Sequence, residues 1–165
     1  MQLLKNIVIN AAIILALLFG LTVSATADPS FDRVKALAEQ GDSFYQTYLG
    51  DHYDTGRGVR QDHTKAFYWH KKSAEQGYSV GQYSLAYSYG EGRGVRQDTA
   101  KAVEWFKKSA KQNNRSAQYH LGTMYEVGEG VRQNKATAKE LYGKSCDNGY
   151  QGGCDDYKRL NEQGY

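Results

Sequence analysis

A segment of seven residues occurs three times in this 165-residue chain at a constant spacing. It reads Gly-Arg-Gly-Val-Arg-Gln-Asp at 56–62 and 92–98, and Gly-Glu-Gly-Val-Arg-Gln-Asn at 128–134, so the spacing is 36 residues. The same shift relates Leu49, Leu85 and Leu121, then Tyr53, Tyr89 and Tyr125, and also Ala66, Ala102 and Ala138. Such a period indicates tandem repeats, which must stack because one short unit cannot bury its own apolar face.

Each repeat contains two apolar patterns with helical spacing. In the middle repeat, Leu85 and Tyr89 belong to the first pattern, and Ala102, Trp105 and Phe106 belong to the second. We therefore expect an A helix and a B helix in every repeat. The predicted A helices cover 45–55, 81–91 and 117–127, the B helices cover 62–76, 98–112 and 134–148, and a leading helix at 31–40 and a trailing helix at 153–163 complete the array.

Polar residues and glycines stand at the predicted helix ends. Asp62, Asp98 and Asn134 lie where the B helices start, and their side-chain oxygens can accept hydrogen bonds from the first-turn amides. The positions just after the B helices are Gly77, Asn113 and Gly149. Glycine and asparagine are favoured there because the residue after a helix often adopts the left-handed conformation.

The first 27 residues have the composition of a secretory signal peptide. Lys5 precedes a largely apolar stretch at 7–23, and Ala25-Thr26-Ala27 is a small-residue cleavage site. We predict cleavage after Ala27 and a periplasmic or secreted location, and an uncleaved membrane anchor is the alternative. The predicted repeat domain, 28–165, consists of a half-repeat 31–44, repeats 45–80, 81–116 and 117–152, and a capping segment 153–165.

Charge and histidine spacing argue against several classes of ligand. The chain has 21 Lys and Arg against 18 Asp and Glu, so no strongly basic domain favours a nucleic-acid partner. The histidines are His52, His63, His70 and His120. They lack the spacing of metal-binding motifs, and we expect neither a metal nor a cofactor.

The repeats resemble Sel1-like repeats, which are relatives of tetratricopeptide repeats. The pattern Ala-x-x-x-Leu-Gly-x-x-Tyr-x-x-Gly-x-Gly-Val runs from Ala117 to Val131, and the first two repeats are similar to it. The resemblance covers roughly residues 35–164. It implies an all-α fold, a right-handed α-solenoid of antiparallel helix pairs, in a monomer that binds a protein or peptide.

The two cysteines are similar to a cysteine pair of the secreted, cysteine-rich Sel1 proteins. Cys146 and Cys154 are separated by seven residues, one at the end of a B helix and the other at the start of the next helix. Two antiparallel helices joined by so short a turn bring these positions within bridging distance. An exported chain meets oxidising conditions, so we predict a disulfide that holds the C-terminal cap.

By analogy with tetratricopeptide grooves, the A helices should line an inner surface that receives the partner. The residues expected on this surface are Thr47, Asp51, Tyr83, Tyr87, Tyr119 and Thr123. Tyrosines on a rigid face give a large contact area at a small cost in entropy, which suits recognition of a protein segment. Helix packing is the alternative role for Tyr83 and Tyr119.

The links between helices carry arginines that form a second candidate surface. These residues are Arg57, Arg60, Arg93, Arg96 and Arg132. An anionic partner could bind such a basic ridge. The alternative is a solvated edge that repeat duplication has simply copied.

Two observations bear on catalysis. Gly77-x-Ser79-x-Gly81 spells the nucleophile motif of some hydrolases, but that motif follows a strand, and here it joins two predicted helices. Some cysteine-rich Sel1 proteins are associated with β-lactams, yet no serine here has a lysine three residues later. We therefore expect a non-catalytic adaptor, and the alternatives are an immunity protein against a secreted toxin and a β-lactam-binding protein.

Overall fold

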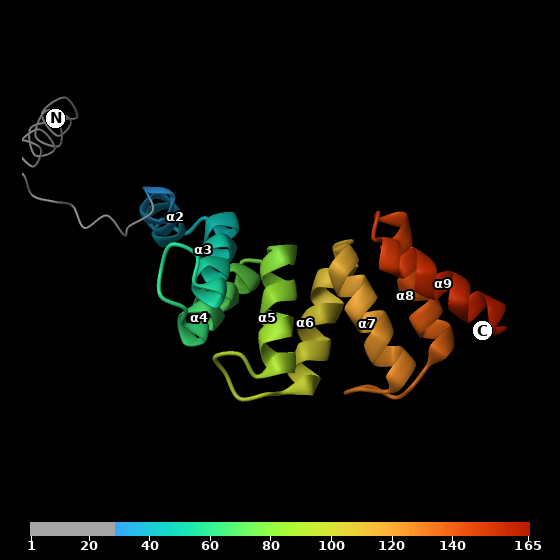
Figure 1. Ribbon diagram of the computed structural model, residues 1–165. Helices are drawn as coiled ribbons and strands as arrows, with labels where there is room; N and C mark the ends of the chain where they lie inside the picture. The colour runs from blue at the N-terminus through green and yellow to red at the C-terminus, as the bar shows by residue number, and fades with distance from the viewer. Residues whose placement is uncertain (1–28) are drawn as a thin grey trace, which may run out of the picture.

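The computed structural model describes residues 29–165, so the predicted signal peptide and its cleavage site lie outside the described residues. Within this range the chain folds into eight helices and no strand, which follow one another in an elongated array (Figure 1). Their bounds are α2 Pro29–Glu39, α3 Ser43–Thr55, α4 His63–Glu75, α5 Ser79–Glu91, α6 Thr99–Lys111, α7 Arg115–Val127, α8 Lys135–Asp147 and α9 Gln151–Glu162. The predicted all-helical solenoid is confirmed.

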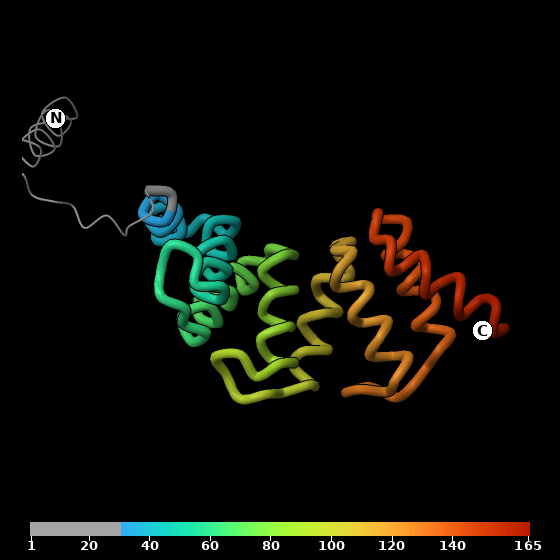
Figure 2. Tube along the Cα trace, viewed as in Figure 1, coloured from blue at the N-terminus to red at the C-terminus, as the bar shows by residue number. Residues whose placement is uncertain are grey.

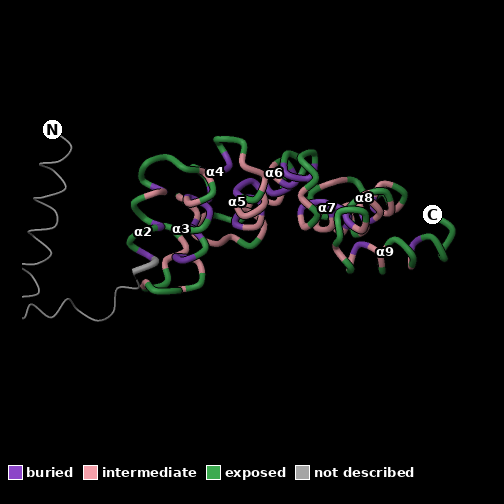
Figure 3. Tube along the Cα trace, turned by 90° about the horizontal axis from the view of Figure 1, so that it is seen from above, coloured by how far each residue is buried: buried purple, intermediate pink, exposed green. Residues whose placement is uncertain are grey.

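Neighbouring helices pack in pairs along the chain. Each A helix (α3, α5 and α7) packs against the B helix that follows it (α4, α6 and α8), and each B helix packs against the next helix in the chain. The tube view follows this alternation from α2 to α9 (Figure 2). Seen from above, α4 and α6 lie toward one side of the array and α3, α5 and α7 toward the other (Figure 3). The A helices α3 and α5 also contact each other directly.

The repeated apolar residues form the core between these helices. Leu49, Leu85 and Leu121 are all buried, as are Ala66, Ala102 and Ala138. The A helices approach their B helices closely because a small residue faces a ring. In the middle repeat Ala86 lies in the same buried cluster as Phe106, and in the third repeat Gly122 lies directly beneath the ring of Tyr142.

A buried hydrogen bond recurs in every repeat and joins a B helix to its A helix. The Ser109 hydroxyl donates to the carbonyl oxygen of Ser79 at 2.7 Å. Ser73 and Ser145 make the equivalent bond in the first and third repeats. The three serines are fully buried, so each bond satisfies a hydroxyl that would otherwise be left without a partner in the interface between the helices.

The caps of the B helices are as predicted. The side chains of Asp62, Asp98 and Asn134 each accept from a first-turn amide at 3.0 Å. The residues after the B helices adopt the left-handed conformation, with φ of 87° at Gly77 and 61° at Asn113.

The A helices begin two residues earlier than predicted. Asp42 accepts from the amides of Phe44 and Tyr45, so α3 starts at Ser43. Asn114 caps α7 by accepting from the Ala117 amide. The prediction followed the apolar pattern alone, and the polar caps extend α3 and α7 upstream of their first buried residues, whereas α5 starts equally early after Tyr78 without a side-chain cap.

The predicted disulfide is confirmed at the C-terminal end. Cys146 in α8 and Cys154 in α9 are bonded, with their Cα atoms 4.6 Å apart. Arg159 of α9 donates twice to Glu126 of α7, with both distances at 2.8 Å. The last helix is therefore held by a covalent bond and an ion pair in addition to the buried Leu160. Among residues 29–165, no helix is both long and apolar enough to cross a bilayer.

Candidate partner-binding site

Two neighbouring clefts open on the side of the A helices. The first cleft, of about 200 Å³, is lined by Asp51, Asp54, His70, Tyr83, Ser84, Tyr87, Ser88 and Arg93. The second cleft, of about 240 Å³, is lined by Tyr87, Gly90, Glu91, Phe106, His120, Thr123, Met124 and Glu129. Tyr87 lines both, so the two clefts are adjacent, and together they are called the groove.

Four of the six predicted groove residues line these clefts. Asp51, Tyr83 and Tyr87 lie in the first, and Tyr87 and Thr123 lie in the second. Thr47 does not, because it is only 3% exposed and its hydroxyl lies 2.7 Å from the hydroxyl of Ser73. A threonine is too short at this position to reach past the packed interface between α3 and α4.

Tyr119 lies further along the chain, near the C-terminal cap. Its ring centroid is 4.9 Å from that of Tyr150 and 5.4 Å from that of Tyr142. Burial raises the pKa of the Tyr119 phenol. Tyr119 is therefore a partly exposed packing residue beside the groove and does not line either cleft.

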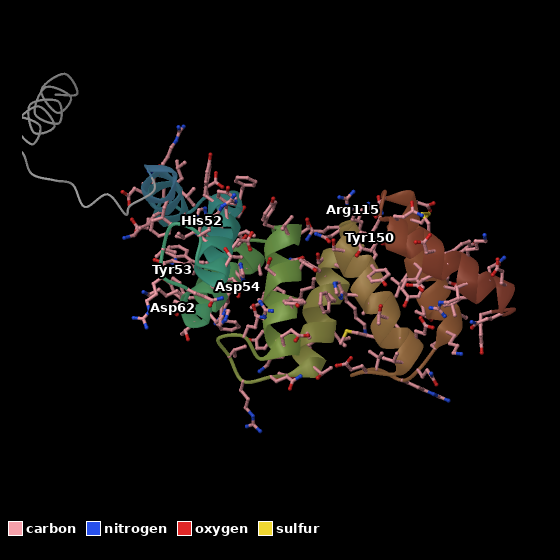
Figure 4. All side chains as sticks on the ribbon, in the orientation of Figure 1. His52, Tyr53, Asp54, Asp62, Arg115 and Tyr150 are labelled. Carbon is pink, nitrogen blue, oxygen red and sulfur yellow. A yellow bond between two sulfur atoms is a disulfide. The ribbon has the colours of Figure 1, made fainter. Side chains whose placement is uncertain are left out.

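The first cleft contains a cation of the chain itself. The Arg93 guanidinium lies 3.1 Å from Asp54 and 5.2 Å from the ring centroid of Tyr87. Asp54 points from α3 toward α5, on the opposite side of the helix from Tyr53 (Figure 4). Asp54 also lies 2.8 Å from His63 Nδ1, so its carboxylate already has two partners.

The second cleft is built around His120. Its ring stacks on Phe106 at 5.6 Å, and its Nε2 atom shares a hydrogen bond of 3.2 Å with the Tyr83 hydroxyl. Burial lowers the pKa of His120, and nearby Glu91 opposes this shift only in part. The imidazole is therefore neutral at neutral pH. Burial also raises the pKa of Tyr83, which stays a phenol able to form hydrogen bonds.

Exposed apolar side chains also lie at the start of the A helices. Phe44 is 53% exposed, and its ring is stacked on that of Tyr48 at 6.2 Å. Val80 occupies the position equivalent to Phe44 in the next repeat and is also exposed. Phe44 and Val80 were not among the residues predicted for the groove. They could have been found as apolar residues at equivalent positions in two repeats, outside the pattern that predicts the core.

The arginine-bearing links form two separate depressions of about 450 Å³ and 500 Å³, which are larger and more open than the two clefts. One is lined by Tyr89, Val95, Arg96, Gln97, Asp98 and Lys101. Another is lined by Lys107, Tyr125, Val131, Arg132, Gln133 and Asn134, mostly the equivalent positions of the next repeat. Of the other linking arginines, Arg93 lies in the first cleft instead.

The hydrolase-like motif spans the turn between α4 and α5 and the first residues of α5. Ser79 is the first residue of α5, directly after the turn from α4. Its carbonyl oxygen accepts the Ser109 hydroxyl, as described above. This environment has no preceding strand, which a nucleophile of that class requires.

Comparison with known proteins agrees with this architecture. The profile of the Sel1 repeat family matches residues 43–78, 79–114 and 115–150. A Sel1 repeat protein from Oxalobacter formigenes is 31% identical, with a TM-score of 0.72 over 76% of this chain and 51% of its own. The c5321 protein, described as a protective antigen of uropathogenic Escherichia coli strains with an SLR fold, is 32% identical, with a TM-score of 0.72 over 82% of this chain and 33% of its own.

A third structure shares the fold at lower identity. Cysteine-rich protein B of Helicobacter pylori is 20% identical, with a TM-score of 0.64 over 76% of this chain and 93% of its own. The chain thus spans about half of the Oxalobacter protein and a third of the Escherichia protein. A search of curated proteins found no match.

Proposed function

Because the chain belongs to the Sel1 repeat family, whose repeats generally form protein-interaction scaffolds, we propose that its groove binds a segment of another protein. One observation carries the proposal. Two pairs of partly exposed aromatic side chains lie on successive A helices, Phe44 with Tyr48 on α3 and Tyr83 with Tyr87 on α5. Exposed apolar side chains that gather on one side of a repeat array are typical of a binding surface.

Rigidity of the groove supports the same function. Tyr83 contacts Phe106 and His120 of neighbouring helices, so its ring is held in place before any partner arrives. Tyr87 is similarly held against Tyr83 and the Arg93 guanidinium. A preorganised aromatic surface loses little conformational entropy on binding, and more of the contact energy is available as affinity.

The dimensions of the groove favour a short segment over a large flat partner surface. Two clefts of about 200 Å³ and 240 Å³ share Tyr87, and each can receive one side chain. Neither is large enough to enclose a drug-sized ligand, for which pockets of about 300–1,000 Å³ are usual. Adjacent clefts on successive repeats therefore suit successive side chains of one peptide.

Site-specific photocrosslinking tests this proposal. A benzophenone amino acid at Tyr87 should give a discrete adduct with an envelope extract of the organism that makes the protein. The same group at Tyr68, an equally aromatic and 49% exposed residue of α4, is the matched control. An excess of unlabelled protein should compete for the adduct, and an excess of the Tyr87→Ala variant should not. Adducts of equal yield from both positions would contradict the proposal.

We also propose that the protein works outside the cytoplasm and without catalysis. The Cys146–Cys154 disulfide supports an oxidising compartment, since such bonds are rare in reducing ones. The helical surroundings of Ser79 support a non-catalytic role. Purified protein should leave nitrocefin unhydrolysed, and turnover above the uncatalysed rate would refute that part of the proposal.

A further inference from the structure

The two clefts occupy equivalent positions in successive repeats but differ in charge. A shift of 36 residues carries Asp54 to Gly90 and Arg93 to Glu129. The first cleft therefore contains an acidic and a basic partner, 3.1 Å apart. The second has lost both members of that pair and has gained a carboxylate where the arginine was.

The next position along the groove again holds an internal pair. Glu126, the equivalent of Gly90 one repeat later, receives two hydrogen bonds from Arg159 at 2.8 Å. The pKa of Glu126 is lowered, first by its bonds to Arg159, so this carboxylate stays ionised. Positions on both sides of the second cleft thus hold a carboxylate neutralised by an arginine of the same chain.

The second cleft has negative charge with no such arginine. Glu91 and Glu129 both line it and are exposed. No basic side chain among residues 29–165 forms an ion pair with either carboxylate, and none lines the cleft. His120 is neutral at neutral pH because burial lowers its pKa. The second cleft is therefore formed largely by positions equivalent to those of the first cleft, but it contains no cation from residues 29–165.

Acidic residues predominate on the A helices and basic residues on the B helices. The A helices α3, α5 and α7 carry four acidic residues and a single arginine, Arg115, at the N-terminal end of α7. The B helices α4, α6 and α8 carry ten lysines and four acidic residues. Two of the four carboxylates of the A helices, Asp54 and Glu126, are paired with Arg93 and Arg159, so the free negative charge of the groove is concentrated at the second cleft, where it attracts positive charge.

We propose that the second cleft receives a lysine or arginine side chain of the bound segment, which takes the place that Arg93 occupies in the first cleft. The inference rests on the proposed function and specifies the chemistry of the partner. The aliphatic part of the basic side chain packs against Tyr87 and His120, which are only half-buried, and its charged end reaches Glu91 and Glu129. Apolar neighbours of that basic residue contact Tyr83 and Tyr87. The partner is thus a protein segment with a basic residue flanked by apolar ones.

Selection from a display library of random 12-residue peptides, followed by affinity measurement on the full chain, tests the inference. We expect enriched peptides to share a lysine or arginine next to an apolar residue. The Glu129→Arg variant, which restores the residue found at Arg57 and Arg93, should weaken their binding about tenfold or more. Glu104 is an exposed residue of α6 outside both clefts. Glu104→Arg makes the same charge change away from the groove and should alter affinity less than about twofold.

The outcomes separate this inference from the proposed function. Peptides that lose binding to Tyr87→Ala but contain no basic residue would leave the groove as the binding site and overturn the basic-residue proposal. Equal losses in Glu129→Arg and Glu104→Arg would overturn it as well, since the effect would then come from net charge. Failure to enrich any peptide dependent on Tyr87 would contradict both the inference and the proposed function.

Discussion

Removal of the disulfide should loosen the C-terminal helix and leave the other repeats unaffected. Cys146 and Cys154 join the end of α8 to the start of α9 across a sequence separation of eight residues. In the Cys146→Ser/Cys154→Ser variant, α9 keeps the buried Leu160 and the ion pair between Arg159 and Glu126. The helix should therefore remain docked at neutral pH but open more often.

The size of the effect follows from the length of the closed loop. For eight residues the chain-entropy relation gives about 2.5 kcal/mol at 25 °C. At about 1.4 kcal/mol per factor of ten, this corresponds to roughly a seventyfold increase in the opening equilibrium of α9. Each repeat of a solenoid contacts only its neighbours, so the change should be confined to α8 and α9.

Amide hydrogen exchange measures this opening helix by helix. Protection factors in α9 should fall by roughly seventyfold in the double variant, and those in α4 and α5 should change by less than about twofold. Wild-type protein treated with a reductant serves as a second sample that lacks the bond without any substitution. A decrease spread evenly over all helices would refute the local account, and a decrease below about fivefold in α9 would refute the magnitude.

Two further predictions concern the folded state. Ser109→Ala should lower the free energy of unfolding by about 0.5–1.5 kcal/mol in urea titrations, because the hydrogen bond to the Ser79 carbonyl is lost. An unchanged midpoint would show that the recurring bond is not stabilising. Burial lowers the pKa of His120, so the unfolded chain binds a proton more readily and the native state should lose stability as pH falls below about 6.5. Urea midpoints should therefore decrease more between about pH 7.5 and about pH 5.5 in the wild type than in His120→Gln, and equal decreases would contradict this assignment.

Most of the fold could be predicted from short sequence patterns that recur every 36 residues. The caps at Asp62, Asp98 and Asn134 act on amides within the same turn, so their role depends on only a few neighbouring residues. The disulfide could equally be predicted from the sequence, since Cys146 and Cys154 are the only cysteines and a short turn separates them.

The candidate site was predicted only in part. Equivalent sequence positions suggested that Thr47 and Tyr119 would line the groove as Tyr83 does. Instead Thr47 is buried beside Ser73, and Tyr119 packs against Tyr150. Side-chain length and the neighbours supplied by the next repeat differ at these positions, and neither follows from the period.

The sequence by itself determined the number of repeats, the helical state of each unit and the covalent closure of the end, because each depends on residues close together in the chain. Only the tertiary structure decided which charges meet. Asp54 and Arg93 are 39 residues apart, and Glu126 and Arg159 are 33 apart. Their pairing depends on how one repeat lies against the next. That Glu91 and Glu129 have no ion-pair partner within residues 29–165 becomes evident only once those pairs are located in space.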